Sequence, residues 1–292
     1  MIFLLLLPSL LLLVVVFLLP LFRYSWLSFH ADSVVTGLIA IPNGVANWVR
    51  LSLDQRYWQA LGQTFRFAAV SVSFELILAL SIALLLDQRW RGRNAVRAIA
   101  LIPWALPTTV MALGWRWILN TPYGPIDRLT NLIGFGSLNI LGEPGLAWLA
   151  TVLADVWKTT PFAALILLAG LQTIPSDLYE ALRLEGANSL SSLRRITLPL
   201  LRPYILLALL FRLAQAFGVF DLIQVLTGGG PAGSTESVAL YAYINALRFL
   251  DFGYSATIII SSFIFICFAC LICWFLIKVL FTPQRSFLKK VS

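Results

Sequence analysis

Six long apolar stretches, separated by polar connections, dominate the amino-acid sequence. Each has about the 20 residues, or more, that an α-helix needs to cross the hydrocarbon core of a bilayer. None shows the alternating pattern of a membrane β-strand, and in lipid the backbone amides must be satisfied within the segment, so each stretch is predicted to be a helix. The expected spans are residues 2–22, 58–86, 97–119, 146–171, 199–226 and 255–281.

This pattern predicts an all-α membrane protein with one transmembrane domain over residues 1–292. Hydrophobic residues make up 60% of the chain and charged residues 12%, against roughly 45–50% and about 25% in soluble domains, which excludes a soluble globular protein. The first stretch is predicted to be an uncleaved span. No basic segment precedes it, it is longer than the apolar region of a signal peptide, and no A-x-A site follows.

The cations are unevenly divided among the connections. Because cytoplasmic loops collect Lys and Arg, the loops richest in them are predicted to be cytoplasmic, together with both termini. The net charge of +8 follows from this topology, and no basic stripe on a soluble face indicates nucleic-acid binding. The cation-rich segments are residues 87–97, residues 172–203 and the tail with Lys278, Arg285, Lys289 and Lys290.

The connection between the fourth and fifth spans, residues 172–203, is long and has signs of internal order. Pro175 ends the preceding helix. Asp177, followed three residues later by Glu180, resembles a capping box. These features predict a helix over residues 177–185, a rod of about 13 Å.

The same connection also carries signals for a turn and a second helix. Gly186 can adopt the left-handed conformation in which helices end. Asn188 or Ser189 can cap a second short helix that carries Arg194 and Arg195 toward the lipid headgroups. Taken alone, these features are explained equally well by a simple amphipathic connector.

The spacing within this loop resembles that of a known family. Glu180-Ala181 is followed by Gly186 and, after nine further residues, by Ile196-x-Leu198-Pro199. This pattern resembles the signature loop of the permease subunits of binding-protein-dependent ABC importers. The resemblance implies a type I importer fold, in which the loop forms a coupling helix that docks into a groove on an ATPase subunit. The residues it assigns to coupling are Glu180, Ala181, Leu182, Glu185, Gly186, Ile196 and Pro199; Leu182 and Glu185 replace the usual Ala and Asp.

Further blocks resemble the sugar-importer branch of this family, in particular the maltose, trehalose and glycerol phosphate importers. The resemblance implies a bacterial inner-membrane subunit that moves a sugar or related polyol into the cytoplasm. Its expected partners are a second homologous permease, two ATPase subunits and an extracytoplasmic substrate-binding protein. The matching blocks are IPWALP (102–107), GWRWILN (114–120), WKTTPF (157–162), TGGGPAGSTE (227–236) and FGYSAT (252–257).

The chain itself is not expected to be an enzyme or to bind a cofactor. Lys158-Thr159 does not complete a phosphate-binding loop, because Trp157 occupies the position that requires Gly. ATP and Mg are therefore expected on the partner ATPase subunits. Cys267, Cys270 and Cys273 lie on one apolar stretch without His or carboxylate nearby, so they are predicted to be packing residues and not metal ligands.

Several ionisable side chains lie inside the predicted spans, where charge is costly and marks the bundle interior or a water-filled path. Asp155 and Lys158 share one helical face and can pair with each other or contact substrate hydroxyls. The polar residues of the fifth span carry the same two alternatives, and Trp157 can stack on a sugar ring. The candidate pathway residues are Asp155, Trp157, Lys158, Arg212, Gln215 and Asp221; Arg66, Glu75 and Arg116 complete the ionisable set.

Two other functions are compatible with a multi-span chain. A stand-alone carrier could couple transport to ions through the buried charges, but no inverted repeat is evident. A membrane-embedded enzyme acting on lipid or glycan would need paired carboxylates or a nucleophile with its base, and the carboxylates here are scattered over different spans.

Overall fold

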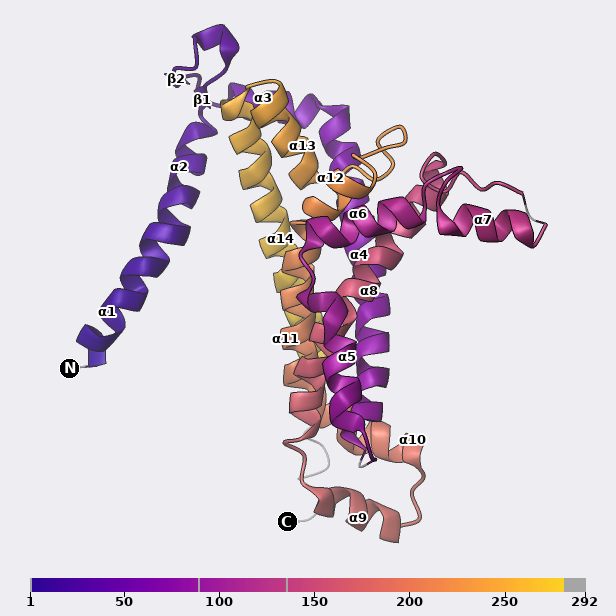
Figure 1. Ribbon diagram of the computed structural model, residues 1–292. Coiled ribbons are helices and arrows are strands. Elements are labelled where there is room, and N and C mark those ends of the chain that lie inside the picture. Colours follow the sequence, from indigo (N-terminus) through magenta and orange to yellow (C-terminus); the bar gives the residue numbers. More distant parts are fainter. Residues whose placement is uncertain (1, 89, 135, 281–292) are drawn as a thin grey trace.

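The computed structural model describes residues 2–88, 90–134 and 136–280, which are mostly helical. A short two-stranded antiparallel sheet, β1 (His30–Ala31) with β2 (Ile41–Pro42), lies at the end of the molecule near α3 (Figure 1). The α-helices are α1 (Ile2–Leu13), α2 (Leu19–Leu27), α3 (Ala46–Leu53), α4 (Gln55–Asp87), α5 (Arg93–Ala105), α6 (Thr108–Ile118), α7 (Pro125–Leu132), α8 (Pro144–Leu171), α9 (Ser176–Leu184), α10 (Ser189–Ser192), α11 (Leu198–Phe217), α12 (Asp221–Leu226), α13 (Val238–Tyr243) and α14 (Phe252–Leu280).

Short irregular helices join some of these elements. Three have π-helical turns and one is a 3₁₀ turn. They are η1 (Val14–Leu18), η2 (Val34–Thr36), η3 (Leu193–Thr197) and η4 (Ile244–Arg248).

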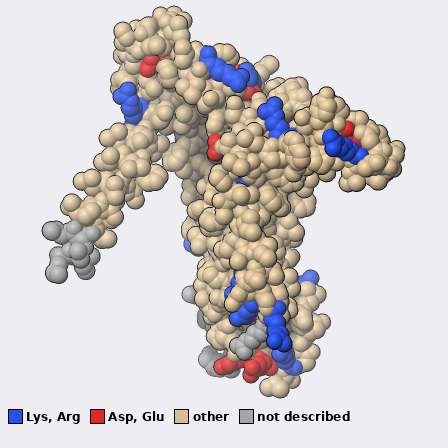
Figure 2. All heavy atoms as spheres, viewed as in Figure 1, with Lys and Arg blue, Asp and Glu red and all other residues tan. Residues whose placement is uncertain are grey.

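The centre of the molecule is a bundle in which α4 and α8 pack along their lengths and α11 packs against both. Small residues such as Ala79, Ala83, Ala163 and Ala164 are buried between them, which lets the helix backbones approach closely. Gly170 serves the same purpose, since a Cβ there would lie 2.5 Å from the Tyr204 ring. Charged side chains on the visible face gather toward the two ends and leave the middle nearly uncharged (Figure 2).

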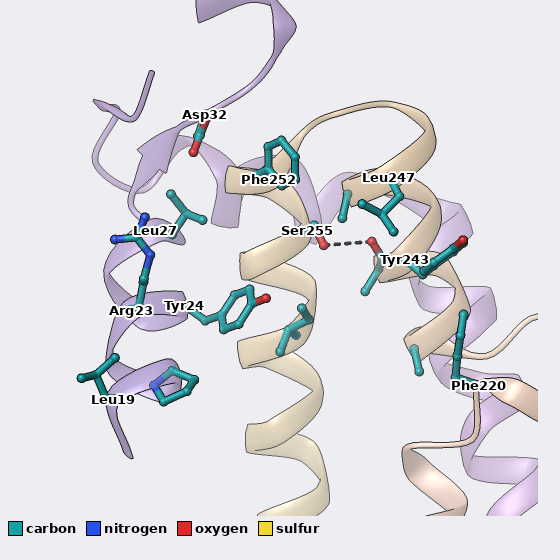
Figure 3. A pocket seen from close by; sticks show the side chains of 15 residues that line it. Leu19, Arg23, Tyr24, Leu27, Asp32, Phe220, Tyr243, Leu247, Phe252 and Ser255 are labelled. Atoms are coloured by element: carbon teal, nitrogen blue, oxygen red, sulfur yellow. Dashed lines mark hydrogen bonds between the residues drawn. The ribbon is translucent and has the colours of Figure 1, made fainter. Parts of the chain in front are cut away.

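The first span leaves this bundle. α1, η1 and α2 form one apolar helix that touches α14 through α2 and diverges from the bundle toward its N-terminus (Figure 1). Its most apolar 18-residue window is 0% buried. A cavity of about 720 Å³, the α2 groove, separates α2 from α13 and α14. Tyr24 points across this groove from α2, and Tyr243 and Leu247 line its opposite side (Figure 3).

The third expected span, residues 97–119, is broken, which corrects the prediction of one continuous helix. α5 ends at Ala105, α6 begins at Thr108, and their axes meet at 89°. Pro107 has no N–H to continue the hydrogen-bond ladder, and it forces Leu106 into an extended conformation with ψ 138°. α6 then lies across the bundle and packs against α12 (Figure 1).

The fifth expected span, residues 199–226, is displaced toward the N-terminus, because the continuous helix of α10, η3 and α11 covers Ser189–Phe217. α11 ends at Phe217, the chain bends at Gly218, and a separate helix, α12, starts at Asp221. The prediction that placed Asp221 inside the fifth span was therefore wrong.

The second, fourth and sixth expected spans correspond to α4, α8 and α14. Residue 281 and the tail cations Arg285, Lys289 and Lys290 lie outside the described residues. Within the described chain, five helices are long and apolar enough to cross a membrane, or six if the bent pair α5 and α6 forms one span. Cys270 and Cys273 of α14 pack against the apolar cluster of α4, α8 and α11, as expected for packing residues, whereas Cys267 is exposed.

A hydrogen-bonded cluster around Asp54 fixes the start of α4. The Asp54 carboxylate caps the helix by accepting from the backbone N–H groups of Arg56 and Tyr57, and it also accepts from the hydroxyls of Tyr241 and Tyr254. Burial alone would raise the pKa of Asp54, but these four hydrogen bonds outweigh it and lower the pKa below its ordinary 3.8. Burial and the bond to Asp54 raise the pKa of Tyr241 to about 12.

Replacing Asp54 by asparagine is expected to flatten the acid dependence of stability. A lowered carboxyl pKa adds stability that is fully present above 3.8, the ordinary value, and is lost as the pH falls through the folded-state value. As the pH falls from about 5 through the folded-state pKa, the midpoint of thermal unfolding in detergent should fall less steeply in Asp54→Asn than in the wild type. Parallel curves for the two proteins would contradict this role.

Candidate functional site: an exposed loop and a buried ion cluster

The 172–203 loop contains two short helices at the end of the bundle opposite the β-strands (Figure 1). α9 begins at Ser176, after Pro175 in the N-cap position, and no side chain caps it. The expected capping box of Asp177 and Glu180 is therefore wrong. Pro175 already ends the preceding segment in an extended conformation, so the helix begins one residue earlier and Asp177 falls in its first turn.

The end of α9 follows the sequence prediction at Gly186, which has a φ of +79°. The N–H of Gly186 donates to Arg183 O at 2.9 Å, and the N–H of Ala187 donates to Leu182 O at 3.2 Å. These two bonds form a Schellman motif, which closes a helix through a left-handed residue.

The second helix, α10, is capped by Asn188 as expected, but it is not a separate short helix, because α10, η3 and α11 form one continuous helix over Ser189–Phe217. The Asn188 side chain accepts from the Ser191 N–H at 2.9 Å, and the chain continues through η3 into α11. The Tyr179 hydroxyl lies 3.0 Å from Thr197 Oγ1, joining α9 to η3. The loop is thus held at both ends by long helices and tied across its middle.

Most residues assigned to coupling lie on the surface of this loop. Glu180, Ala181, Glu185 and Gly186 are exposed, while Leu182, Ile196 and Pro199 are half-buried. Two leucines that the sequence reasoning did not single out accompany them: Leu184 is 91% exposed and Leu178 is 44% exposed. The amino-acid sequence already indicated these two leucines, because apolar residues on a short helix in a polar loop indicate a contact surface.

A second cluster lies inside the bundle, where Arg212 of α11 pairs with two carboxylates. Its guanidinium donates twice to Glu75 of α4, once at 2.8 Å between Nη2 and Oε1. It also donates to Asp155 Oδ2 of α8 at 3.1 Å and to Gln215 Oε1 at 2.5 Å. Glu75 is 0%, Arg212 2% and Asp155 7% exposed, so the three helices meet at a desolvated ion cluster.

This arrangement corrects the expected pairing of Asp155 with Lys158. Asp155 points into the bundle toward Arg212, whereas the Lys158 ammonium donates to the backbone carbonyls of Leu106 at 2.6 Å and Trp104 at 3.4 Å. Asp155 and Lys158 are three residues apart and share a helical face, but this spacing could not show which neighbouring helix offered each of them a better partner. Glu75 was counted among the ionisable residues and not among the site residues.

Aromatic side chains of α5, α6, α8 and α11 form two contacting groups. The Trp104 ring stacks on Phe162 at 5.1 Å, Phe162 lies 5.1 Å from Phe211, and Trp115 meets Trp157 at 5.9 Å, edge to face. We call these five residues the aromatic face. Trp157 is 44% exposed, and the exposed Gln215 side chain lies one turn beyond Phe211 on α11.

The structure thus brings together four of the six candidate pathway residues in two groups. Asp155, Arg212 and Gln215 form the ion cluster, and Trp157 belongs to the aromatic face. Lys158 lies at the break between α5 and α6. Asp221 is separate, exposed in the first turn of α12.

The sequence is similar to those of transport permeases. Over 265 residues it is 44% identical to the trehalose/maltose transport system permease protein MalF of Thermococcus litoralis, covering 90% of this chain and 89% of that protein. Over 260 residues it is 36% identical to the sulfoquinovosyl glycerol transport system permease protein SmoG of Agrobacterium fabrum, covering 89% of this chain and 84% of that protein.

The fold is similar to that of a chain in the crystal structure of a bacterial ABC transporter involved in the import of the acidic polysaccharide alginate. The TM-score is 0.82, at 20% sequence identity, and the match covers 96% of both chains.

The family model for the binding-protein-dependent transport system inner membrane component matches residues 75–280, which include α8, the 172–203 loop and α11. Together with the MalF similarity, this match confirms the resemblance deduced from the loop and identifies a transport subunit, not an enzyme. The chain belongs to the family of binding-protein-dependent transport system inner membrane components.

Proposed function

We propose that this protein is the permease subunit of an ATP-driven importer and that the 172–203 loop couples it to a partner ATPase. The observation that carries the proposal is the exposed helix α9, held between α8 and α11 with Leu184 91% exposed. A short rod fixed at both ends transmits displacement, whereas a flexible loop would absorb it. Glu180 is available for an ion pair with an Arg of the ATPase, and Ala181 permits close approach.

The topology we propose has six spans, with α5 and α6 together forming the third, and both termini in the cytoplasm. The 172–203 loop and its Arg194 and Arg195 then face the cytoplasm, in line with the positive-inside rule. α7, α13 and the β-strands lie at the opposite end (Figure 1), where an extracytoplasmic binding protein would deliver substrate.

A second, homologous permease is proposed to complete the pathway. The first span has no buried residue in its most apolar window, and the α2 groove opens between it and the bundle (Figure 3). Both surfaces are available to helices of a partner. ATP and Mg would be bound by the two ATPase subunits.

The proposed cargo is a sugar or related polyol, in keeping with the names of the MalF and SmoG relatives. The aromatic face offers flat apolar rings for the C–H faces of a sugar, and Gln215 beside it offers an amide to hydroxyl groups. We assign the pathway to this face, with Trp157 and Gln215 in contact with cargo. Asp155 and Arg212 support the face from the bundle interior, and Lys158 lies at its border, whereas Asp221 lies apart at the start of α12.

The coupling assignment predicts a specific cross-link. In a variant lacking the three native cysteines, Leu184→Cys should cross-link to a copurified ATPase subunit, because Leu184 projects from α9. The matched control is Leu132→Cys on α7, which is 84% exposed at the other end of the molecule and should give no ATPase cross-link.

The same preparation tests the function itself. ATP hydrolysis by the reconstituted complex should be stimulated by sugar-loaded binding protein, and a thermal-shift panel of sugars and polyols on that binding protein would identify the cargo. Substrate uptake by this chain alone in liposomes under an ion gradient, without an ATPase, would instead establish the stand-alone carrier.

A further inference from the structure

We propose that Lys158 is a positioning residue that holds the corner between α5 and α6, and that release of this corner permits the pathway to open outward. The second half of this proposal rests on the function proposed above. That Lys158 holds the corner does not depend on that function.

The corner leaves backbone carbonyls without helical partners. The last carbonyls of any α-helix lack an intrahelical donor, and α5 ends in the middle of a span at an 89° bend. Pro107 cannot donate to them because it has no N–H. In a membrane, such groups must find a donor within the protein.

Lys158 supplies that donor. Its ammonium lies 2.6 Å from Leu106 O and 3.4 Å from Trp104 O. Positive charge at the C-terminal end of α5 is also favoured by the helix dipole. Among the described residues, no carboxylate lies within salt-bridge distance of Lys158, and Asp155, the nearest acid on α8, pairs with Arg212. The backbone of the corner is therefore the ammonium's partner.

A ring contact from the same face of α8 strengthens this attachment. Phe162 lies one turn after Lys158, and it stacks on Trp104 with the ring planes 12° apart. Residues four apart share a helix face. From one face of α8, Lys158 therefore contacts the carbonyl of Trp104 and Phe162 contacts its ring. α8 is well suited as the anchor, because 56% of its most apolar window is buried.

Movement at the corner would be transmitted through α6 to α12. α6 packs on α12 through a buried cluster that includes Met111, Ala112, Leu222 and Leu226. α12 in turn follows α11 across the bend at Gly218. A change in the α5–α6 angle would therefore displace α6 and α12 together, at the end where the binding protein is proposed to dock.

The test uses Lys158→Met, which keeps the apolar stem and removes the donors, in the complete transporter. Lys158→Arg keeps a cation with donors and serves as the rescue variant. The matched control is Arg66→Met, which removes a different cation from a span; the Arg66 guanidinium lies 4.1 Å from the Trp148 ring centre and does not contact the corner. Lys158→Gln, which removes the charge and keeps the two N–H donors of a shorter side chain, replaces the methionine variant if that complex does not assemble.

The first readout is amide hydrogen exchange of a peptide covering residues 102–108. Lys158→Met should exchange at least about tenfold faster there, corresponding to a loss of about 1.4 kcal/mol of local protection. Lys158→Arg and Arg66→Met should match the wild type. Unchanged exchange in Lys158→Met would overturn the assignment of Lys158 to the corner.

The second readout is ATP hydrolysis without binding protein. If the corner restrains outward opening, Lys158→Met should raise this basal rate several-fold and reduce the binding-protein concentration for half-maximal stimulation, with the maximal rate little changed. Faster exchange at the corner with unaltered basal hydrolysis would overturn the opening role. A wild-type complex that shows no stimulated hydrolysis would refute the proposed function, and exchange alone would then decide whether Lys158 holds the corner.

Discussion

Replacing Gly186 by valine is expected to abolish substrate-stimulated ATP hydrolysis while leaving the protein inserted in the membrane. Gly186 has a φ of +79°, a conformation that costs an L-residue roughly 1–2 kcal/mol and a β-branched one more. No atom lies within 4 Å of the position a Cβ would take, so the substitution causes no clash. It instead disfavours the Schellman turn, and with it the orientation of α9.

The control for this experiment is Gly37→Val. Gly37 has a φ of +65° with nothing within 4 Å of its Cβ position, so it carries a comparable backbone penalty, but it lies by the β-strands, far from α9. Hydrolysis by the reconstituted complex and the amount of membrane-inserted protein are measured for both variants. Wild-type stimulation in Gly186→Val would remove the basis for assigning coupling to this loop.

Replacing Arg212 by methionine is expected to destabilise the fold by about 3–5 kcal/mol, because it leaves two buried carboxylates without a positive partner. Arg212 is 2% exposed and Glu75 0% exposed, so water cannot replace the lost hydrogen bonds. The free energy of unfolding in detergent, from thermal or denaturant transitions, measures the effect.

Arg50→Met provides the matched comparison. Arg50 pairs with Asp251 at 2.7 Å, but its side chain is 54% exposed, and exposed pairs contribute about 0–1 kcal/mol. A further variant that combines Arg212→Met with Glu75→Gln and Asp155→Asn should recover much of the lost stability, since no unpaired charge remains. Equal losses in Arg50→Met and Arg212→Met would show that the buried cluster has no special energetic role.

The long uninterrupted spans were predictable because twenty or more apolar residues leave a chain few options in lipid. The breaks in the third and fifth expected spans were harder to predict. Pro107 and Gly218 are visible in the sequence, yet membrane helices tolerate both residue types where neighbouring helices satisfy the freed backbone groups. Whether a span kinks or ends at such a residue depends on the surrounding packing, which is not a local property.

The 172–203 loop could be predicted better than the ion cluster, for the same physical reason. The left-handed turn at Gly186 and the cap at Asn188 follow from local backbone chemistry, so their sequence signals sufficed. The partner of Asp155 depends on α4 and α11, whose contributing residues Glu75 and Arg212 lie 80 and 57 positions away along the chain. Spacing along one helix identifies possible neighbours but does not rank them against side chains from elsewhere.

The divergence of the first span bears on how the chain is made. This helix is synthesised before the helices that follow it in the chain, and in the part of the chain that the structure describes its most apolar window is 0% buried. Its insertion therefore need not wait for the remainder of the polypeptide. Residues 2–22 contain no charged side chain, so the segment is stable in lipid on its own and can remain there while the other helices are synthesised and assembled.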